Sequence, residues 1–374
     1  MKGVGIAVLV AVLALAVVAL PLAGASSPRD DHGATAAVFI STNSATANQV
    51  VAYETGHAGT LTWVGNFATG GTGTGAALGD SGALGLTSDN QWLLSVDAGS
   101  NQISVFQVST GLHTPLLTLT DVAASGGVLP VSLTISGNVV YVLNDGNTVT
   151  PGNIAGFTLG SHGRLHPITG STQSLSTSMP TGAAQISFSP TGHFLVVTEK
   201  GTNLLDVYAV NNHGVASGPT SYASSGLTPY GFAFAGKHHL VVSEAHQPAV
   251  SSYSLTRSSG LQVVSASISD EQGAPCWVVV TGNQQTAYIS NTASDSISSF
   301  AVSTGGSLTL LQSVAAMTNA GPADSAIGDG GHFLYVVAGG AGEIEAYQIH
   351  HDTSLSWIQT VGGLPAGAEG LVAT

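Results

Sequence analysis

Seven apolar stretches recur along the chain, each ending in an aromatic residue, and their spacing is the strongest regularity in the sequence. The intervals between successive aromatic ends are 53, 51, 51, 45, 47 and 47 residues. A period of roughly 40–50 residues made of short strands is typical of β-propeller blades. The pattern therefore predicts one continuous repeat domain over residues 36–374. The aromatic ends are Tyr53, Phe106, Phe157, Tyr208, Tyr253, Phe300 and Tyr347.

Each repeat carries three further strand signals around its aromatic stretch. A run rich in branched and aromatic residues comes before it, as in residues 194–198 (FLVVT) and 333–337 (FLYVV). A turn containing Gly, Pro, Asn or Asp and one more short strand come before that run, and a fourth strand follows the aromatic residue. We therefore expect an all-β fold of four-stranded antiparallel blades, with strands A to D running from the centre to the rim.

The first repeat lacks its own strand A, because residues 26–35 are polar. The last four residues, 371–374 (LVAT), supply an apolar strand that no other repeat needs. We expect this C-terminal strand to pair with residues 37–42, which completes a seven-bladed propeller and removes two exposed strand edges. In such a ring the B-to-C and D-to-A connections share one face, here called the top face, around the mouth of the central channel.

The first 25 residues have the composition of a signal peptide. Lys2 precedes an uncharged apolar run over residues 4–20, and Ala23-Gly24-Ala25 forms a cleavage site of small residues. Cleavage would leave Ser26 as the first residue and residues 26–35 as a polar leader. An uncleaved membrane anchor is the alternative, although the run is short for a span of about 20 residues. We expect a secreted or extracytoplasmic bacterial protein with no membrane span after cleavage.

Charged residues are scarce, and this limits the partners of the chain. They make up 7% of the sequence, and the net charge is −14 with His neutral. Binding to nucleic acid requires clustered Lys and Arg, so a nucleic-acid partner is excluded. Cys276 is the only cysteine, so no intrachain disulfide can form. We expect a monomer near neutral pH.

Oxygen-bearing side chains gather at one kind of position in the predicted blades. The residue just after strand B is polar in six of the seven repeats, and the D-to-A loops add three carboxylates. Both positions belong to the top face, so these residues are predicted to line the channel mouth. They are Asn43, Asp97, Asn144, Glu199, Glu244 and Asn291 after strand B, and Asp80, Asp324 and Glu369 in the loops.

Three interpretations of this set stay open. Glu199 or Glu244 could act as a general base on water, assisted by His246 or Lys200, because crowded carboxylates raise one another's pKa. The loop carboxylates Asp80, Asp324 and Glu369 could instead hold Ca²⁺ or another divalent cation, which takes oxygen ligands. Alternatively, these side chains only satisfy backbone groups in tight loops, as Asn and Asp often do.

Other residues near the predicted mouth are candidates for substrate binding. Asp97, Asn144 and Asn291 offer hydrogen bonds, and Tyr230 and Trp277, at the start of A strands, could stack on a sugar ring. Residues 79–82 (GDSG) match a serine-hydrolase string, but no helix follows them and no His/Asp partner is placed by the fold.

With the blades assigned, the chain resembles the lactonase family of seven-bladed β-propellers, which includes phosphogluconolactonase and carboxymuconate-cyclase types. The segments that carry the resemblance are residues 186–208, 229–234 (PYGFAF), 240–245 (LVVSEA) and 275–300. The resemblance implies hydrolysis or formation of a lactone ring, without a required redox cofactor. It also implies a site of Glu, His and Arg at the channel mouth.

The site implied by this resemblance is only partly present. Glu199 and Glu244 fall where a family Glu would lie, and His246 follows Glu244 by two residues. No Arg falls on the top face, where Lys200 is the one basic candidate. Because an anionic lactone needs a cation to bind it, the sequence favours a small uncharged lactone. A non-catalytic extracellular binding or scaffold propeller is the alternative.

Overall fold

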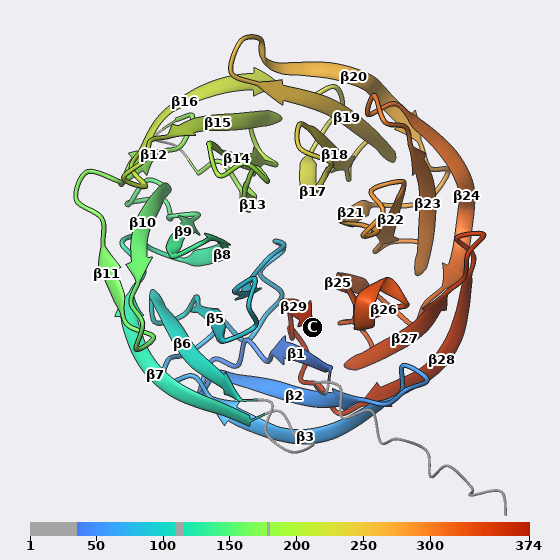
Figure 1. Ribbon diagram of the computed structural model, residues 1–374, viewed down its shortest axis with the longest axis horizontal. Helices are drawn as coiled ribbons and strands as arrows, with labels where there is room; N and C mark the ends of the chain where they lie inside the picture. The colour runs from blue at the N-terminus through green and yellow to red at the C-terminus, as the bar shows by residue number, and fades with distance from the viewer. Residues whose placement is uncertain (1–35, 110–115, 178–179) are drawn as a thin grey trace, which may run out of the picture. The chain divides into compact units, whose positions relative to one another are not determined.

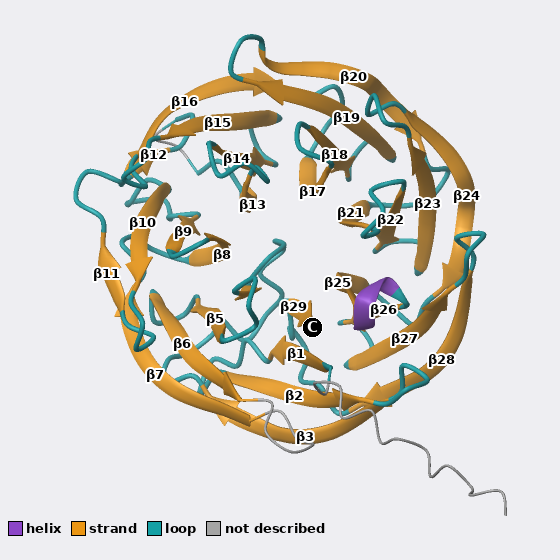
Figure 2. Cartoon of the chain, viewed as in Figure 1, coloured by secondary structure: helices purple, strands orange, loops and turns teal. Residues whose placement is uncertain are grey.

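A computed structural model describes residues 36–109, 116–177 and 180–374. The predicted signal peptide (1–25) and polar leader (26–35) lie outside the described residues. Within those ranges the chain forms antiparallel sheets arranged in a ring, and the one helical element is a short 3-10 turn at Asp329–Gly331 (Figures 1 and 2). The seven-bladed propeller expected from the repeats is confirmed. No helix of the described residues is long and apolar enough to cross a membrane.

Within each blade the strands follow one another from the centre of the ring outward. Blade 1 contains β29 (Leu371–Ala373), β1 (Ala37–Ser41), β2 (Gln49–Thr55) and β3 (Leu61–Ala68). Blade 2 contains β4 (Leu84–Leu86), β5 (Trp92–Asp97), β6 (Gln102–Ser109) and β7 (Leu116–Ala124). Blade 3 contains β8 (Pro130–Ser136), β9 (Val139–Asn144) and β10 (Asn153–Leu159), with β11 (Leu165–Pro167) and β12 (Gln173–Ser174) outside.

The remaining four blades are regular. Blade 4 contains β13 (Ala183–Phe188), β14 (Phe194–Glu199), β15 (Leu204–Val210) and β16 (Ala216–Ala223). Blade 5 contains β17 (Pro229–Ala235), β18 (His239–Glu244), β19 (Ala249–Thr256) and β20 (Gly260–Ser269). Blade 6 contains β21 (Pro275–Val280), β22 (Thr286–Asn291), β23 (Ser296–Val302) and β24 (Leu308–Met317). Blade 7 contains β25 (Pro322–Gly328), β26 (Phe333–Ala338), β27 (Glu343–Ile349) and β28 (Leu355–Gly362).

The aromatic residue of each repeat marks a bend in its blade. In six blades the register between the third and fourth strands shifts at this residue, as at Tyr53 and Tyr347. A bulge of this kind increases the local twist, which lets the outer strand follow the rim of the ring. Blade 3 differs, because two short strands, β11 and β12, share the outer position along β10. The expectation of four uniform strands therefore holds for six blades.

The second strand of each blade is buried along its length because it lies between two neighbouring blades. In β26, for example, all six residues of the strand are buried. The outermost strands instead consist mainly of partly buried and exposed residues, as β24 does. This explains why the sequence signal is a continuous apolar run for the inner strands and weaker for the rim.

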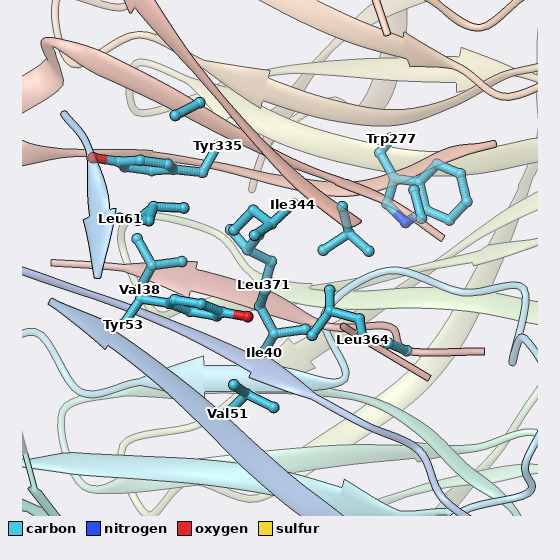
Figure 3. Close-up of a cluster of buried hydrophobic side chains, with 14 of the residues drawn as sticks. Val38, Ile40, Val51, Tyr53, Leu61, Trp277, Tyr335, Ile344, Leu364 and Leu371 are labelled. Carbon is cyan, nitrogen blue, oxygen red and sulfur yellow. The ribbon is translucent and has the colours of Figure 1, made fainter. Parts of the chain in front are cut away.

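The C-terminal strand closes the ring as the sequence predicts. In β29, Leu371 pairs with Ile40, Val372 with Phe39 and Ala373 with Val38. Leu371 is buried in a cluster formed mainly by blades 1 and 7, among Ile40, Ile344 and Leu364 (Figure 3). The closure therefore joins strand pairing with apolar packing.

Closure can be tested with one buried leucine. We expect Leu371→Ala to lower the free energy of unfolding by about 2–4 kcal/mol, because it leaves a cavity where β29 meets blades 1 and 7. Leu311→Ala, on the outer face of β24 where the side chain is 47% exposed, is the matched control. Its effect should stay within about 0.5 kcal/mol. Equal urea-unfolding midpoints and slopes for Leu371→Ala and the parent would contradict this closure.

Candidate functional site

The polar residues that end the second strands are buried and form hydrogen bonds with nearby loops and strands. Side chains of a strand stand perpendicular to its sheet, so in a propeller they point to the next blade rather than to the axis. Glu244 is fully buried and accepts hydrogen bonds from the Gly226 amide (2.8 Å), Ser251 Oγ (2.6 Å) and Ser267 Oγ (2.7 Å). Both carboxylate oxygens of Glu244 are therefore used in joining the loop before blade 5 to its outer strands.

Glu199 has the same kind of environment in blade 4. It is fully buried and accepts hydrogen bonds from the Ser176 amide (3.0 Å), Ser176 Oγ (2.5 Å) and Thr202 Oγ1 (2.6 Å). Asp206, on the neighbouring strand β15, lies beside it. Burial, with the charge of Glu199 as a further cause, raises the pKa of Asp206 to about 7. The predicted catalytic roles of Glu199 and Glu244 stay predictions, and the structure places the two residues in separate hydrogen-bond networks.

The predicted binding residues at the other strand ends are also buried and locally bonded. Asp97 accepts hydrogen bonds from Asn48 Nδ2 (2.9 Å), Thr69 Oγ1 (2.6 Å) and Ser104 Oγ (2.5 Å), and burial raises its pKa. Asn144 donates to the Asn153 side chain (3.0 Å). With its amide in the orientation that satisfies both atoms, Asn291 donates to Asp270 Oδ2 (2.8 Å) and accepts from Ser298 Oγ (3.3 Å). These contacts match the interpretation in which polar residues satisfy groups of the loops and adjacent blades.

Blade 7 also has a buried, hydrogen-bonded carboxylate near its top face, but it comes from a residue that sequence reasoning missed. Its second strand ends in Ala338, and Glu345 of β27 supplies the carboxylate instead. Glu345 accepts hydrogen bonds from the Asn319 amide (3.0 Å) and Tyr347 Oη (3.1 Å). It stands in the register position that Ser251 has in blade 5. A search for polar residues at this position of the third strands would have found it.

The ring axis is occupied by the connection between β3 and β4, residues 69–83, here called the axial loop. Figure 1 shows it reaching toward the middle of the ring. The Ser81 amide donates to the Ala184 carbonyl in blade 4 (3.0 Å), and Ser132 Oγ in blade 3 donates to the Ser81 carbonyl (2.6 Å). Lys200 Nζ donates to the Gly79 carbonyl, and Trp277 Nε1 donates to the Asp80 carbonyl (2.7 Å). Side chains from several blades thus meet on this short segment.

Two carboxylates hold the axial loop from the side of blade 7 and the C-terminus. Glu369 lies in the loop before β29, whereas Asp324, expected in a loop, lies within strand β25. Glu369 accepts hydrogen bonds from three consecutive amides, those of Leu78 (2.6 Å), Gly79 (3.3 Å) and Asp80 (3.0 Å). Asp324 accepts from the Gly370 amide (2.6 Å) and from Ser81 Oγ (3.3 Å). Burial raises the pKa of Glu369, and burial with the nearby Glu369 charge raises the pKa of Asp324 to about 8.

Asp80 is the exceptional member of this group. Its side chain is fully buried, and neither carboxylate oxygen has a hydrogen-bond partner among the described residues. Burial, followed by the charges of Glu369 and Asp324, raises its pKa well above the usual range, while Lys200 acts in the opposite direction. Buried polar groups are nearly always paired, so an unpaired carboxylate is unusual, and together with its raised pKa it makes Asp80 a candidate functional residue. Asp206 in blade 4 is a second buried carboxylate with both oxygens unpaired in the described structure.

The predicted aromatic binding residues, Tyr230 and Trp277, lie beside Lys200 and the axial loop. Lys200 Nζ lies 4.9 Å from the centre of the Tyr230 ring, within the range of a cation–π contact. The rings of Tyr230 and Trp277 meet edge to face with centroids 5.2 Å apart. Six of the predicted site residues thus meet at the axial loop, and we call this group the axial cluster. It consists of Asp80, Lys200, Tyr230, Trp277, Asp324 and Glu369.

A divalent cation does not fit the axial cluster. The oxygens of Glu369 and Asp324 already accept hydrogen bonds from N–H and O–H groups, which leaves only the two oxygens of Asp80 free. Ca²⁺ takes 6–8 oxygen ligands. Across the described part of the chain, no group of three His, Cys, Asp or Glu side chains is placed to hold a metal ion.

His246 lies apart from the axial cluster. It is exposed in the turn between β18 and β19. No hydrogen bond among the described residues links it to Glu244. Its predicted role as an assistant to Glu244 therefore has no contact to support it.

Comparison with known proteins places this arrangement in a family. The family model described as "Lactonase, 7-bladed beta-propeller" matches residues 84–280 and 261–363. The chain belongs to this lactonase family. No curated protein matches its sequence significantly.

Solved structures of similar fold support the architecture of this lactonase-family chain. One is a Bacteroides fragilis protein provisionally assigned as a 6-phosphogluconolactonase (TM-score 0.72, 15% identity, 93% of this chain and 99% of that chain). Another is the periplasmic gluconolactonase PpgL of Pseudomonas aeruginosa (TM-score 0.70, 14% identity, 89% and 98%). At these identities the likeness concerns the fold alone.

The raised pKa of Asp324 predicts a pH-dependent stability. A carboxyl group with a pKa of about 8 when folded, against 3.8 as its ordinary value, binds more protons folded than unfolded between these pH values. Stability conferred through this group is therefore greatest at low pH and falls as the pH rises from about 4 to about 8. We expect Asp324→Asn to flatten the fall in melting temperature between pH 5 and 8.

Asp89→Asn is the control for this titration, because Asp89 is exposed and its pKa is lowered by the Thr87 hydroxyl. It should leave the slope of the parent between pH 5 and 8 in place. Identical pH profiles for the parent and Asp324→Asn would contradict the proposed burial of a protonated Asp324.

Proposed function

We propose that the protein is an exported lactonase that hydrolyses a small, uncharged lactone at the axial cluster on the top face. The observation that carries the proposal is Asp80, a fully buried carboxylate with two unpaired oxygens at the axis of a lactonase-family propeller. Export is supported by the composition of residues 1–25.

Lactone hydrolysis needs a base that takes a proton from water while the water oxygen attacks the ring carbonyl. In this proposal an oxygen of Asp80 takes that proton, and the carbonyl oxygen gains negative charge in the transition state. Lys200, whose ammonium group bonds the adjacent Gly79 carbonyl, is the nearby cation that can stabilise this charge. The ring C–O bond then breaks, the departing alkoxide recovers the proton, and the product is a hydroxy acid.

The charge of the axial cluster favours a neutral substrate. Three carboxyl groups surround one lysine, and of the four Lys and Arg residues in the described ranges only Lys200 contacts the axial loop. A phosphate or carboxylate on the substrate would be repelled by any ionised member of this group. Because Asp80 is buried, entry of the substrate requires displacement of the axial loop, which has positive φ at Gly79 and Gly82.

A non-catalytic binding propeller is the second candidate. It is favoured by the fact that Glu369, Asp324, Glu199 and Glu244 all accept hydrogen bonds from the fold itself. On this alternative the axial loop is a structural plug and Asp80 has no reacting partner.

Turnover on a panel of neutral γ- and δ-lactones, followed by acid release in a pH-stat, separates the two candidates. We expect hydrolysis by the parent and a loss of at least about 100-fold in kcat for Asp80→Asn, since a general base typically contributes 10²–10⁴-fold. Glu271→Gln, an exposed carboxylate in the loop before β21, is the matched control and should retain the parental rate.

A folded parent protein without turnover on any lactone would favour the binding propeller, and equal rates for the parent and Asp80→Asn would contradict the role of Asp80. Export is checked by the mass of the protein recovered outside the cytoplasm, which identifies its first residue. Ser26 is expected as its first residue, and a chain that keeps Met1 would contradict cleavage.

A further inference from the structure

A groove between blades 4 and 5 is not used by the proposed lactonase site. Three adjoining hollows of about 570, 450 and 230 Å³ share Phe194 and Arg257 in their walls. The two larger ones fall within the usual range of ligand sites, roughly 300–1,000 Å³. Together they form an open surface groove around these two residues.

The groove lies on the face opposite the top face. Its walls come from the turns that join β13 to β14, β15 to β16, β17 to β18 and β19 to β20. These are A-to-B and C-to-D connections, whereas the axial loop is a D-to-A connection. A ligand in the groove would therefore be separate from one at the axial cluster.

Positive charge is concentrated in this groove. The described ranges contain four Lys and Arg residues against eighteen Asp and Glu, and two of the four, Lys237 and Arg257, line the groove. His193, His213 and His238 add three imidazoles, and none of the three hollows is lined by a carboxylate. In a chain of net charge −14, this is a local reversal of sign.

The two fixed cations of the groove have no counter-ion in the described structure. The only ion pair found among the described residues joins Arg164 to Asp121, with 3.9 Å between Nη1 and Oδ1. Lys237 and Arg257 are both exposed and lie beyond 4 Å of any described carboxylate oxygen. Their charges are therefore available to an external anion, and the Arg257 guanidinium can bind a carboxylate with two hydrogen bonds.

The rest of the lining suits a hydroxyl-rich molecule. The side-chain amide of Asn212 is exposed and forms no hydrogen bond with the described residues, and the hydroxyls of Ser217 and Thr220 lie on the exposed side of β16. Phe194 is half-buried at the point shared by all three hollows. An aromatic surface beside a free amide and exposed hydroxyl groups, of which Ser217 Oγ also donates to the Ala209 carbonyl (3.4 Å), matches the alternating apolar and polar faces of a sugar ring.

We propose that this groove binds an anionic saccharide of the uronate type. Lys237 and Arg257 bind its carboxylates, Asn212 and the β16 hydroxyls bond its hydroxyl groups, and a sugar ring packs on Phe194. The proposal does not depend on the lactonase activity, because the groove shares no residue with the axial cluster.

Binding can be measured by isothermal titration or by ¹⁵N chemical-shift changes with tri-galacturonate at low ionic strength. We expect Arg257→Gln and Lys237→Gln each to weaken binding by about two- to fivefold, which corresponds to loss of one exposed charge contact. Arg164→Gln removes a matched exposed cation from another blade and should change the affinity less than twofold. Raising the salt concentration to 0.5 M should also weaken binding, because the Debye length shrinks.

Two further ligands decide which chemistry the groove recognises. The methyl ester of tri-galacturonate keeps the sugar and removes the charge, and tripolyphosphate keeps the charge and removes the sugar. Weaker binding of both than of tri-galacturonate supports the proposal. The proposal would be overturned if the ester bound as tightly as tri-galacturonate, or if tripolyphosphate bound and tri-galacturonate did not. It would also be overturned if Arg164→Gln weakened binding as much as Arg257→Gln, or if tri-galacturonate did not bind at all.

Discussion

The hydrogen bonds from three successive amides of the axial loop to Glu369 are the constraint on which the centre of this propeller depends. They tie residues 78–80 to the turn that precedes the C-terminal strand, so the strand that closes the ring and the loop that fills the channel are directly connected. A carboxylate that accepts several N–H bonds in a buried site makes strong, charge-assisted contacts. The same contacts hold Asp80 at the axis, where its own oxygens find no partner among the described residues.

The fold could be predicted from the sequence because each blade repeats the same local signals. The aromatic spacing, the buried second strands and the surplus C-terminal strand each have a local physical cause, and the structure confirms all three. The exception is blade 3, where β11 and β12 divide the outer position. Residues 160–172 between β10 and β12 contain two turns instead of one, so the outer strand is interrupted.

The site is harder to predict because side-chain direction does not follow from strand order alone. Glu199 and Glu244 are at the ends of second strands, close to the top face, yet their side chains are buried and bond groups of their own blade and of the loop that precedes it. Lys200, one residue further on, reaches the axial loop instead. No helix follows the GDSG string of residues 79–82. Its position at the axis depends instead on the hydrogen bond from the Asp80 amide to Glu369, which is 289 residues further along the chain.

The axial cluster and the groove between blades 4 and 5 have opposite electrostatic characters and lie on opposite faces of one scaffold. The top face holds the carboxyl-rich axial cluster, while the groove between blades 4 and 5 holds half of the described Lys and Arg residues. Neutral and anionic ligands would thus be directed to different places, and neither site requires the rigid strands to move. Only the axial loop, which has no regular secondary structure between β3 and β4, has to shift.

The central claim is that small neutral lactones reach the axial cluster. The indole N–H of Trp277 bonds the Asp80 carbonyl, so its ¹⁵N–¹H resonance reports on this point directly. Titration with a non-hydrolysable lactam analogue should shift the Trp277 resonance while those of Trp63 and Trp357, which are 60% and 62% exposed on the outer strands, stay in place. An unchanged Trp277 resonance at saturating lactam, or equal shifts of all three indoles, would contradict the account.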